Sequence, residues 1–388
     1  MKITFRYILV GARRAFQPLD TGQNKSGRGP DGHIRLQVII HVKMEKINHS
    51  KPLLGEAEAE SLRESLSTAF IANGPLAAEL GRVGASFLGM DFGMAVQSGT
   101  DALTLALEGL GVSRGAKIAL PAYVCSAPLD ALAVLGLEPV PVDVDRGTLA
   151  ISPELIPKGV DAVVGAHLFG IPASFSGISG VPLVEDCAQT LGTGSDGCRV
   201  GSMGVVSVCS FYATKLLTSG HGGLVATSDA ELFGRMKEVT VCDNMDVWTP
   251  RRHFRMSDLN AALALAQFER LESMLERRRK LAARFLSAMR QGEPTPGCVY
   301  SRFLVVSEGS AVSALSDFAA AGIEAKRPVY KPLFEYLDRA GNDFPNAAWA
   351  WDNLISVPLY PALTEDEVER IESFLEARSD ELRRWPPA

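Results

Sequence analysis

The chain has 388 residues, of which 46% are hydrophobic and 22% are charged, with a formal net charge of -6. This length favours two or three domains with a large buried core. The acidic balance argues against nucleic acid or an anionic membrane as a partner, and no apolar stretch approaches the length of a membrane span. Six cysteines without a C-x-x-C pair, and without histidine at metal-ligand spacing, predict reduced thiols in a cytoplasmic protein without a metal site.

The N-terminal extension, residues 1–46, differs from the rest of the chain. Its first 43 residues carry a net charge of +6, which leaves -12 for the remainder, and residues 21–32 are rich in turn-forming types. Three interpretations stay open: a disordered tail, an organelle transit sequence, or an extension upstream of a natural start at Met44. We favour the last, because regular pattern begins just after Met44.

Apolar residues at helical spacing predict two helices, over 56–70 and 76–88, separated by an N-G-P break. A short strand over 94–96 then leads to a turn, Ser98-Gly99-Thr100, at the start of another helix. A strand, a small-residue turn and a helix start form an anion pocket, because backbone N–H groups point outward and the helix dipole attracts negative charge. Ser98 and Thr100 as simple N-caps are the alternative.

Strands and helices alternate further along the chain. Apolar runs predict strands over 117–120, 140–144, 162–166 and 183–184, with a helix over 126–135. Each strand ends in polar or small residues, as expected where a parallel sheet places its binding loops. The pattern predicts an α/β fold with an open, mostly parallel, doubly wound sheet. A dinucleotide-binding domain is disfavoured, because no G-x-G-x-x-G follows the first strand.

Lys215 lies in a turn between two apolar runs, Val205–Val208 and Leu224–Ala226, which predict a buried strand and a return strand. An enclosed ammonium is costly to desolvate, and a lysine with a lowered pKa is the requirement for a Schiff-base nucleophile. A surface lysine in a hairpin loop is the alternative interpretation.

The C-terminal part predicts a smaller α+β unit. Helical pattern covers 231–241 and a long region over 256–290, in which we expect the run from Arg277 to Lys280 to be solvated. A Gly- and Pro-rich stretch, 292–297, predicts a boundary between a large domain, 47–290, and a small domain, 291–388. The small domain is expected to hold a strand over 299–306 and helices over 312–320 and 364–374, the last opened by a capping box.

Three features occur in a suggestive order: the Ser98-Gly99-Thr100 turn, an acid at a strand end (Asp186), and Lys215. Pyridoxal phosphate needs a phosphate-binding turn, a lysine for its Schiff base and an acid that keeps its ring nitrogen protonated. The order of these residues therefore favours pyridoxal phosphate as the cofactor.

The chain closely resembles the DegT/DnrJ/StrS family, pyridoxal-phosphate aminotransferases of fold type I that act on nucleotide-linked keto sugars. The resemblance runs from about Leu53 to Phe374. It is carried by the segments NGP, QSGTDALTLAL, LPAYVCS, HLFGIPA, VEDCAQTLG, SFYATK, GGLVAT, FRMSDLNAA and SVPLYPALTEDEVERI.

The resemblance assigns a role to each matching residue. Lys215 matches the Schiff-base lysine, Asp186 the partner of the pyridine nitrogen, and Gln189 the residue on the ring hydroxyl side. The phosphate would be held by the residues that match the family's cradle, which are Ser98, Gly99, Thr100 and Ser210. The lysine also separates this chain from dehydratase relatives, which carry a histidine in its place.

Several positions depart from the family pattern. Cys125 stands where relatives carry an aromatic residue that stacks on the cofactor, and Tyr123 nearby is a possible substitute. His253 replaces an asparagine that reaches the phosphate across a dimer interface, and it can still donate to phosphate. Leu216 and His221 also differ from the usual residues. These changes lie around the substrate pocket.

Other polar residues have simpler interpretations. His167 is expected to be a hydrogen-bonded core histidine, and Asp143 and Asp145 to be turn-forming acids. Arg255 is either structural or holds an acid of substrate or protein. Without a basic neighbour in sequence, an inert thiol is favoured for Cys125.

The resemblance implies transamination with L-glutamate as the amino donor and a nucleotide-linked deoxysugar as the acceptor. It also implies a homodimer with a shared active site. Two alternatives stay open. One is a pyridoxal-phosphate enzyme of the same fold that eliminates, dehydrates or aminates a non-sugar substrate. The other is a cofactor-binding regulator without turnover.

Overall fold

The computed structural model describes residues 25–28, 34–37, 45–195, 197–242, 246–307 and 310–386. The chain divides into two compact units, Met1–Lys46 and Ile47–Ala388. In the first unit, β1 (Lys25–Arg28) pairs antiparallel with β2 (Ile34–Gln37), and the sequence had predicted no strand there. The rest of the predicted extension up to Met44, which includes the proposed start, lies outside the described residues.

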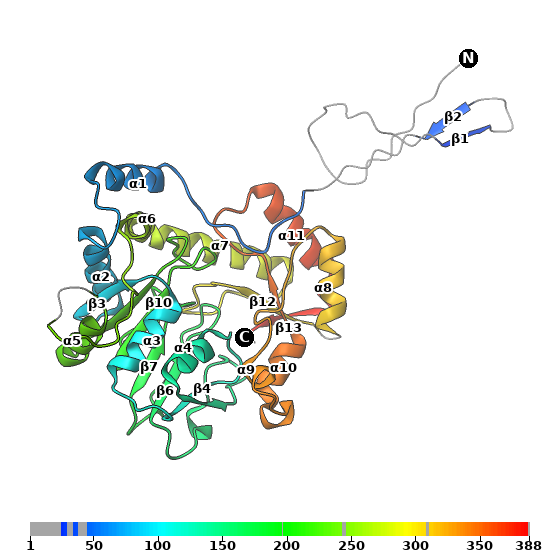
Figure 1. Cartoon of the computed structure of the whole chain (residues 1–388). Coiled ribbons are helices and arrows are strands. Elements are labelled where there is room, and N and C mark those ends of the chain that lie inside the picture. The colour runs from blue at the N-terminus through cyan, green and yellow to red at the C-terminus, as the bar shows by residue number, and fades with distance from the viewer. Residues whose placement is uncertain are drawn as a thin grey trace. The chain divides into compact units, whose positions relative to one another are not determined.

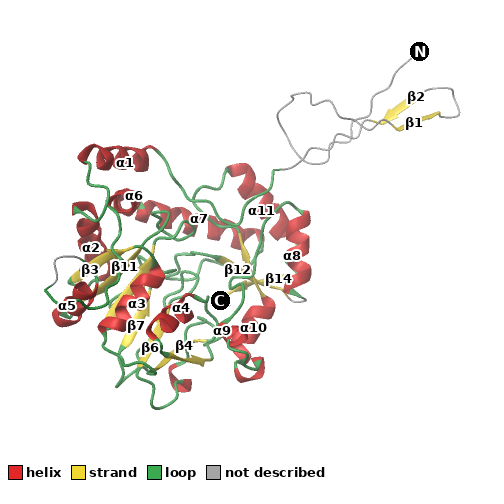
Figure 2. Cartoon of the chain, in the orientation of Figure 1, coloured by secondary structure: helices red, strands yellow, loops and turns green. Residues whose placement is uncertain are grey.

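The second unit is organised around a seven-stranded sheet with the order β3-β11-β10-β7-β6-β4-β5 (Figures 1 and 2). The strands are β3 (Phe92–Val96), β4 (Lys117–Pro121), β5 (Glu138–Val142), β6 (Ala162–Ala166), β7 (Leu183–Asp186), β10 (Val206–Ser210) and β11 (Gly223–Thr227). Only β11 runs antiparallel to its neighbours; the other paired strands are parallel. This topology confirms the predicted mostly parallel sheet.

Helices cover both faces of the sheet, as a doubly wound fold requires. Alternate residues of β11 face opposite sides: Val225 lies in one apolar cluster with α3, and Leu224 lies in another with α2. Between residues 75 and 240 the remaining elements are short connections and outer helices. They are α2 (Pro75–Leu88), α3 (Gly99–Gly109), α4 (Ala127–Leu135), a 3-10 turn (Pro153–Leu155), β8 (Gly194–Ser195), β9 (Cys198–Arg199) and α5 (Ala230–Val239).

The long helical region predicted over 256–290 is two helices, α6 (Asp258–Glu269) and α7 (Leu271–Ala288). The break falls at Arg270, whose guanidinium lies 2.6 Å from the carboxylate of Glu58 in α1 (Glu56–Thr68). The expectation of a solvated basic run is wrong for Arg278, which is only 5% exposed, because α7 turns this residue inward. The Nη1 of Arg278 donates to the carbonyls of Tyr300 and Leu359.

The C-terminal part holds a three-stranded antiparallel sheet with the order β13-β12-β14. Its elements are β12 (Phe303–Ser307), α8 (Ala311–Ala320), α9 (Leu333–Tyr336), a 3-10 turn (Gly341–Asp343), α10 (Pro345–Asn353), β13 (Leu354–Val357), α11 (Glu365–Ala377) and β14 (Leu382–Trp385). The predicted capping box at Thr364 is confirmed. Both parts belong to one unit, Ile47–Ala388, so the division at residue 290 stays a prediction. Over the described residues, no helix combines the length and apolarity needed to cross a membrane.

Candidate active site

The strand register brings several predicted site residues to one edge of the large sheet. Asp186 is the last residue of β7 and pairs with Val208 of the parallel strand β10, so Asp186 and Ser210 end neighbouring strands. Gly223 of β11 pairs with Ser210 on one side and with Val96 of β3 on the other. The turn that follows β3 therefore starts beside the end of β10.

The predicted phosphate turn lies at the N-terminus of α3. The Oγ of Ser98 accepts from the backbone N–H of Asp101 at 3.0 Å, so Ser98 is the N-cap of this helix. The first N–H groups of a helix have no partner inside it, and those of Gly99 and Thr100 are at this position. A Cβ built on Gly99 would lie 2.7 Å from the Cβ of Ser210, so the turn packs directly on Ser210. Backbone N–H groups, a helix dipole and a hydroxyl thus converge, which suits a phosphate.

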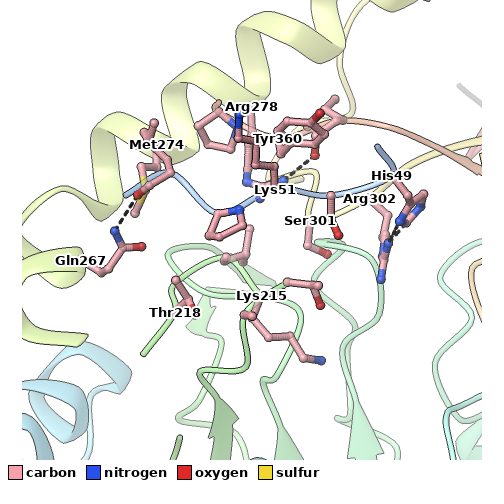
Figure 3. A pocket seen from close by; sticks show the side chains of 18 of the residues that line it. His49, Lys51, Lys215, Thr218, Gln267, Met274, Arg278, Ser301, Arg302 and Tyr360 are labelled. Atoms are coloured by element: carbon pink, nitrogen blue, oxygen red, sulfur yellow. Dashed lines mark hydrogen bonds between the residues drawn. The ribbon is translucent and has the colours of Figure 1, made fainter. Parts of the chain in front are cut away.

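Lys215 lies in the loop between β10 and β11, in a pocket that we call the Lys215 pocket (Figure 3). Burial lowers the pKa of Lys215, and the charge of Arg302 adds to this effect, while the negative forms of Cys125 and Asp186 oppose it. The residue as a whole is partly exposed, and its amine is desolvated. This environment suits a nucleophilic amine and disfavours the interpretation as a plain surface lysine.

Asp186 carries a desolvated carboxyl group at the end of β7. Burial raises the pKa of Asp186, which the N–H of Ala188 at 2.9 Å and the charge of Lys215 partly offset. A desolvated carboxylate of this kind is stabilised by a nearby cation. Gln189 has a fixed orientation, because its Oε1 accepts from the N–H of Phe169 at 3.2 Å, which leaves its amide nitrogen as a hydrogen-bond donor.

Cys125 is exposed and close enough to Lys215 to influence its pKa, so the two residues are neighbours. Tyr123 does not take over that role. Its ring has no exposed surface and packs edge-on against Phe169, and its hydroxyl faces the carbonyl of Ala350 at 3.5 Å. A ring buried in the core has no face to offer to a ligand.

The structure does not bring His253 into the Lys215 pocket of the same chain. His253 lines a different, open hollow together with His221 and Arg255, which we call the His253 hollow. The carbonyl of His253 accepts from Nε2 of Gln97, one residue before the phosphate turn. The side chain of Arg255 donates to Oγ1 of Thr240 at 3.4 Å, a contact that agrees with a structural role.

His167 belongs to the core, as expected. Its Nδ1 accepts from the N–H of Ala173 at 2.9 Å, so its Nε2 carries the proton and donates to Glu185 at 2.9 Å. Burial alone would raise the pKa of Glu185, but the bond from His167 and backbone N–H groups outweigh it and lower the pKa. Cys187 lies close to this pair. Both nitrogens of His167 are engaged in hydrogen bonds, so the cluster forms a structural network.

Asp143 and Asp145 are structural too. The carboxylate of Asp145 accepts from the N–H groups of Gly147 and Thr148 in a turn, as predicted. The carboxylate of Asp143 accepts from Asn346 and Ala347 at the start of α10. Neither acid faces the Lys215 pocket.

Among the residues of the Lys215 pocket that the sequence did not reveal are His49, Ser301 and Arg302. Nη1 of Arg302 lies 2.8 Å from Nδ1 of His49, although 253 positions separate the two residues. No local motif marks either residue, so only the tertiary structure reveals the pair.

A model of the DegT/DnrJ/EryC1/StrS aminotransferase family matches residues 52–376. Among similar solved structures, the aminotransferase TlmJ from Streptoalloteichus hindustanus is 27% identical with a TM-score of 0.78, covering 85% of this chain and 98% of that one. The PLP form of Spr1654 from Streptococcus pneumoniae is 23% identical with a TM-score of 0.78, over 86% and 99%. Helicobacter pylori PseC is 20% identical with a TM-score of 0.78, over 87% and 100%.

The family match extends over more than half of the chain and includes Asp186, Lys215 and the phosphate turn. The likeness to solved structures covers the same region and confirms the predicted fold type I. The chain therefore belongs to the DegT/DnrJ/EryC1/StrS aminotransferase family, and it is a pyridoxal-phosphate-dependent aminotransferase.

Proposed function

We propose that the protein transfers the amino group of L-glutamate to the keto group of a nucleotide-linked deoxysugar. Family membership supports the reaction type. Sugar aminotransferase activity is provisionally ascribed to Spr1654, and PseC is an aminotransferase involved in the biosynthesis of pseudoaminic acid. The observation that carries the proposal is the desolvated amine of Lys215 beside Asp186, at the sheet edge that also bears the phosphate turn.

The residues at this edge fit pyridoxal phosphate. Its phosphate would be held by the group that converges there, Ser98, Gly99, Thr100 and Ser210. Asp186 would hold the protonated ring nitrogen, and the amide of Gln189 would donate to the ring hydroxyl. When bound, the cofactor supplies an aldehyde that condenses with amines and a ring that accepts the electron pair left at the substrate Cα.

Lys215 has two tasks in this scheme. Its amine would hold the cofactor until the donor amine displaces it, and the freed Nζ would then remove the proton from Cα of the substrate. The same Nζ would deliver that proton to the carbon next to the ring, acting first as general base and then as general acid. The lowered pKa of Lys215 favours this role, because more of the amine is neutral near pH 7.

A homodimer with a shared active site is part of the proposal. Within one chain His253 lines the His253 hollow and not the Lys215 pocket. A second copy would be needed to present His253 to the phosphate, and most soluble oligomers are symmetric dimers. The six cysteines of the chain are free, which agrees with a reducing compartment such as the cytoplasm.

A spectroscopic experiment tests the proposed reaction. L-Glutamate added to the cofactor-loaded protein should abolish the visible absorbance of the lysine-linked cofactor as the amine form accumulates. A keto-sugar nucleotide should restore that absorbance, and simple ketones should not. No change with glutamate would favour a non-catalytic regulator. Recovery with non-sugar ketones alone would favour the alternative that Cys125 and the other departures mark a different acceptor.

A further inference from the structure

The Lys215 pocket is strongly basic. Its lining side chains include Lys51, Lys215, Arg278 and Arg302, and no aspartate or glutamate lines it. In Figure 3 the Nζ of Lys215 points toward the end of the pocket where Arg302 and His49 lie side by side. A pocket with this charge attracts an anionic group.

Arg302 is a half-buried cation without a counter-ion in the part of the chain that the structure describes. Its guanidinium contacts the imidazole of His49, whose Nδ1 lies 2.8 Å from Nη1. Burial and the charge of Arg302 lower the pKa of His49 to about 3, so this imidazole is neutral at pH 7. Burial also lowers the pKa of Arg302 to about 10, which still leaves the guanidinium charged. A buried charge is costly unless an anion pairs with it.

Ser301 gives an independent sign of a missing ligand. Its Oγ is buried, and within the described residues it has no hydrogen-bond partner. The adjacent residue is fixed in place, because Arg278 donates to the carbonyl of Tyr300 at 3.2 Å. Buried hydroxyls nearly always have a partner. Ser301 and Arg302 therefore present two pre-positioned donors to the same pocket as Lys215.

We propose that Arg302 and Ser301 bind a carboxylate of the substrate beside the amine of Lys215. The proposal rests on the proposed aminotransferase reaction, because an amino-acid donor carries a carboxylate on the carbon that bears its amine. A guanidinium matches a carboxylate with two parallel hydrogen bonds, and the hydroxyl of Ser301 supplies a further donor. A phosphate has its own place at the Ser98-Gly99-Thr100 turn, so a carboxylate is the anion that this end of the pocket selects.

Binding of glutarate, an unreactive dicarboxylate, to the cofactor-loaded protein tests the subsite by calorimetry. Arg302→Gln should weaken glutarate binding about ten- to hundredfold, the effect of losing a charge-assisted hydrogen bond. Arg302→Lys should bind glutarate more tightly than Arg302→Gln and less tightly than the wild type. It keeps the positive charge but loses the planar guanidinium that makes two parallel hydrogen bonds. The matched control is Arg279→Gln on α7, which removes a partly exposed cation paired with Glu272 and should leave binding unchanged. Equal affinity of wild type and Arg302→Gln, or an equal loss in Arg279→Gln, would overturn the proposal.

The half-reaction then identifies which carboxylate is bound. L-Glutamine keeps only the carboxylate next to the amine, so a loss of kcat/KM in Arg302→Gln with both glutamate and glutamine assigns the subsite to that group. A loss with glutamate alone assigns it to the side-chain carboxylate. A wild type that binds glutarate through Arg302 yet does not react with glutamate counts against the proposed donor and leaves the subsite standing.

Discussion

Gly99 of the phosphate turn packs directly against the side chain of Ser210, because a methyl group added at position 99 would lie 2.7 Å from the Cβ of Ser210. Gly99→Ala should therefore displace either the turn or the serine. Overpacking typically costs about 1–3 kcal/mol. This displacement distorts the phosphate-binding groups, so affinity for pyridoxal phosphate should fall about tenfold or more, as measured by fluorescence titration.

The control for this variant is Gly234→Ala on α5, where an added Cβ meets nothing within 4 Å. Alanine is more stable than glycine in a helix interior, so the free energy of unfolding should rise slightly. Affinity for pyridoxal phosphate should stay the same. A Gly99→Ala variant with unchanged cofactor affinity would show that the turn does not hold the phosphate.

Replacing Cys125 should strengthen cofactor binding. Cys125 is exposed beside Lys215, and a thiol has little stacking surface. An aromatic pair contributes about 0.5–1.5 kcal/mol beyond buried area, so Cys125→Phe should tighten pyridoxal phosphate binding about two- to twelvefold. Cys198→Phe, at another exposed cysteine, should change nothing. A weaker or unaltered affinity in Cys125→Phe would place Cys125 away from the cofactor ring.

His49 should make the protein sensitive to acid. Its pKa falls from 6.5 to about 3 on folding, mainly through burial, with Arg302 and Lys326 adding to the shift and Glu324 opposing it. Between these values the unfolded chain binds a proton that the folded chain does not, so stability decreases as pH falls through this window. One proton contributes at most about 1.4 kcal/mol per pH unit.

Urea unfolding at several pH values from 7 to about 5 measures this effect. His49→Gln should give a shallower decrease in the free energy of unfolding than the wild type. His221→Gln, at an exposed histidine, should keep the wild-type slope. Equal slopes for His49→Gln and wild type would mean that the buried imidazole is not neutral in the folded protein.

Mixed dimers test the shared active site. Lys215→Ala removes the covalent amine, and His253→Ala removes the proposed phosphate contact from the partner. In a 1:1 mixture of the two variants, half of the dimers are mixed, and each of these has one site with both native residues. About one quarter of wild-type activity should then return. If His253 acts within its own chain, mixing should restore nothing beyond the sum of the separate variants.

The positions of Asp186, Ser210 and Lys215 could be predicted because their signal is local. Each residue ends or follows an apolar strand, and a parallel sheet gathers such ends at one edge. Arg278 shows the opposite case. It belongs to a run of four basic residues, a pattern that predicts a solvated helix face. In the structure, however, Arg278 lies on the buried side of α7.

The pair of Arg302 and His49 could not be predicted from the sequence. One residue precedes β12 and the other lies in an irregular segment before α1, and 253 positions separate them. Tyr123 was misjudged for a related reason, since nearness to Cys125 in sequence does not reveal which of the two side chains points into the core.

The amine of Lys215 is proposed to hold pyridoxal phosphate covalently. Borohydride reduction of the cofactor-loaded protein, followed by proteolysis and mass spectrometry, tests it directly, because reduction makes the carbon–nitrogen link permanent. The expected result is one modified peptide with the cofactor on Lys215, and no stable modification in Lys215→Ala. Cofactor fixed to another lysine, or equal labelling of both proteins, would contradict the account.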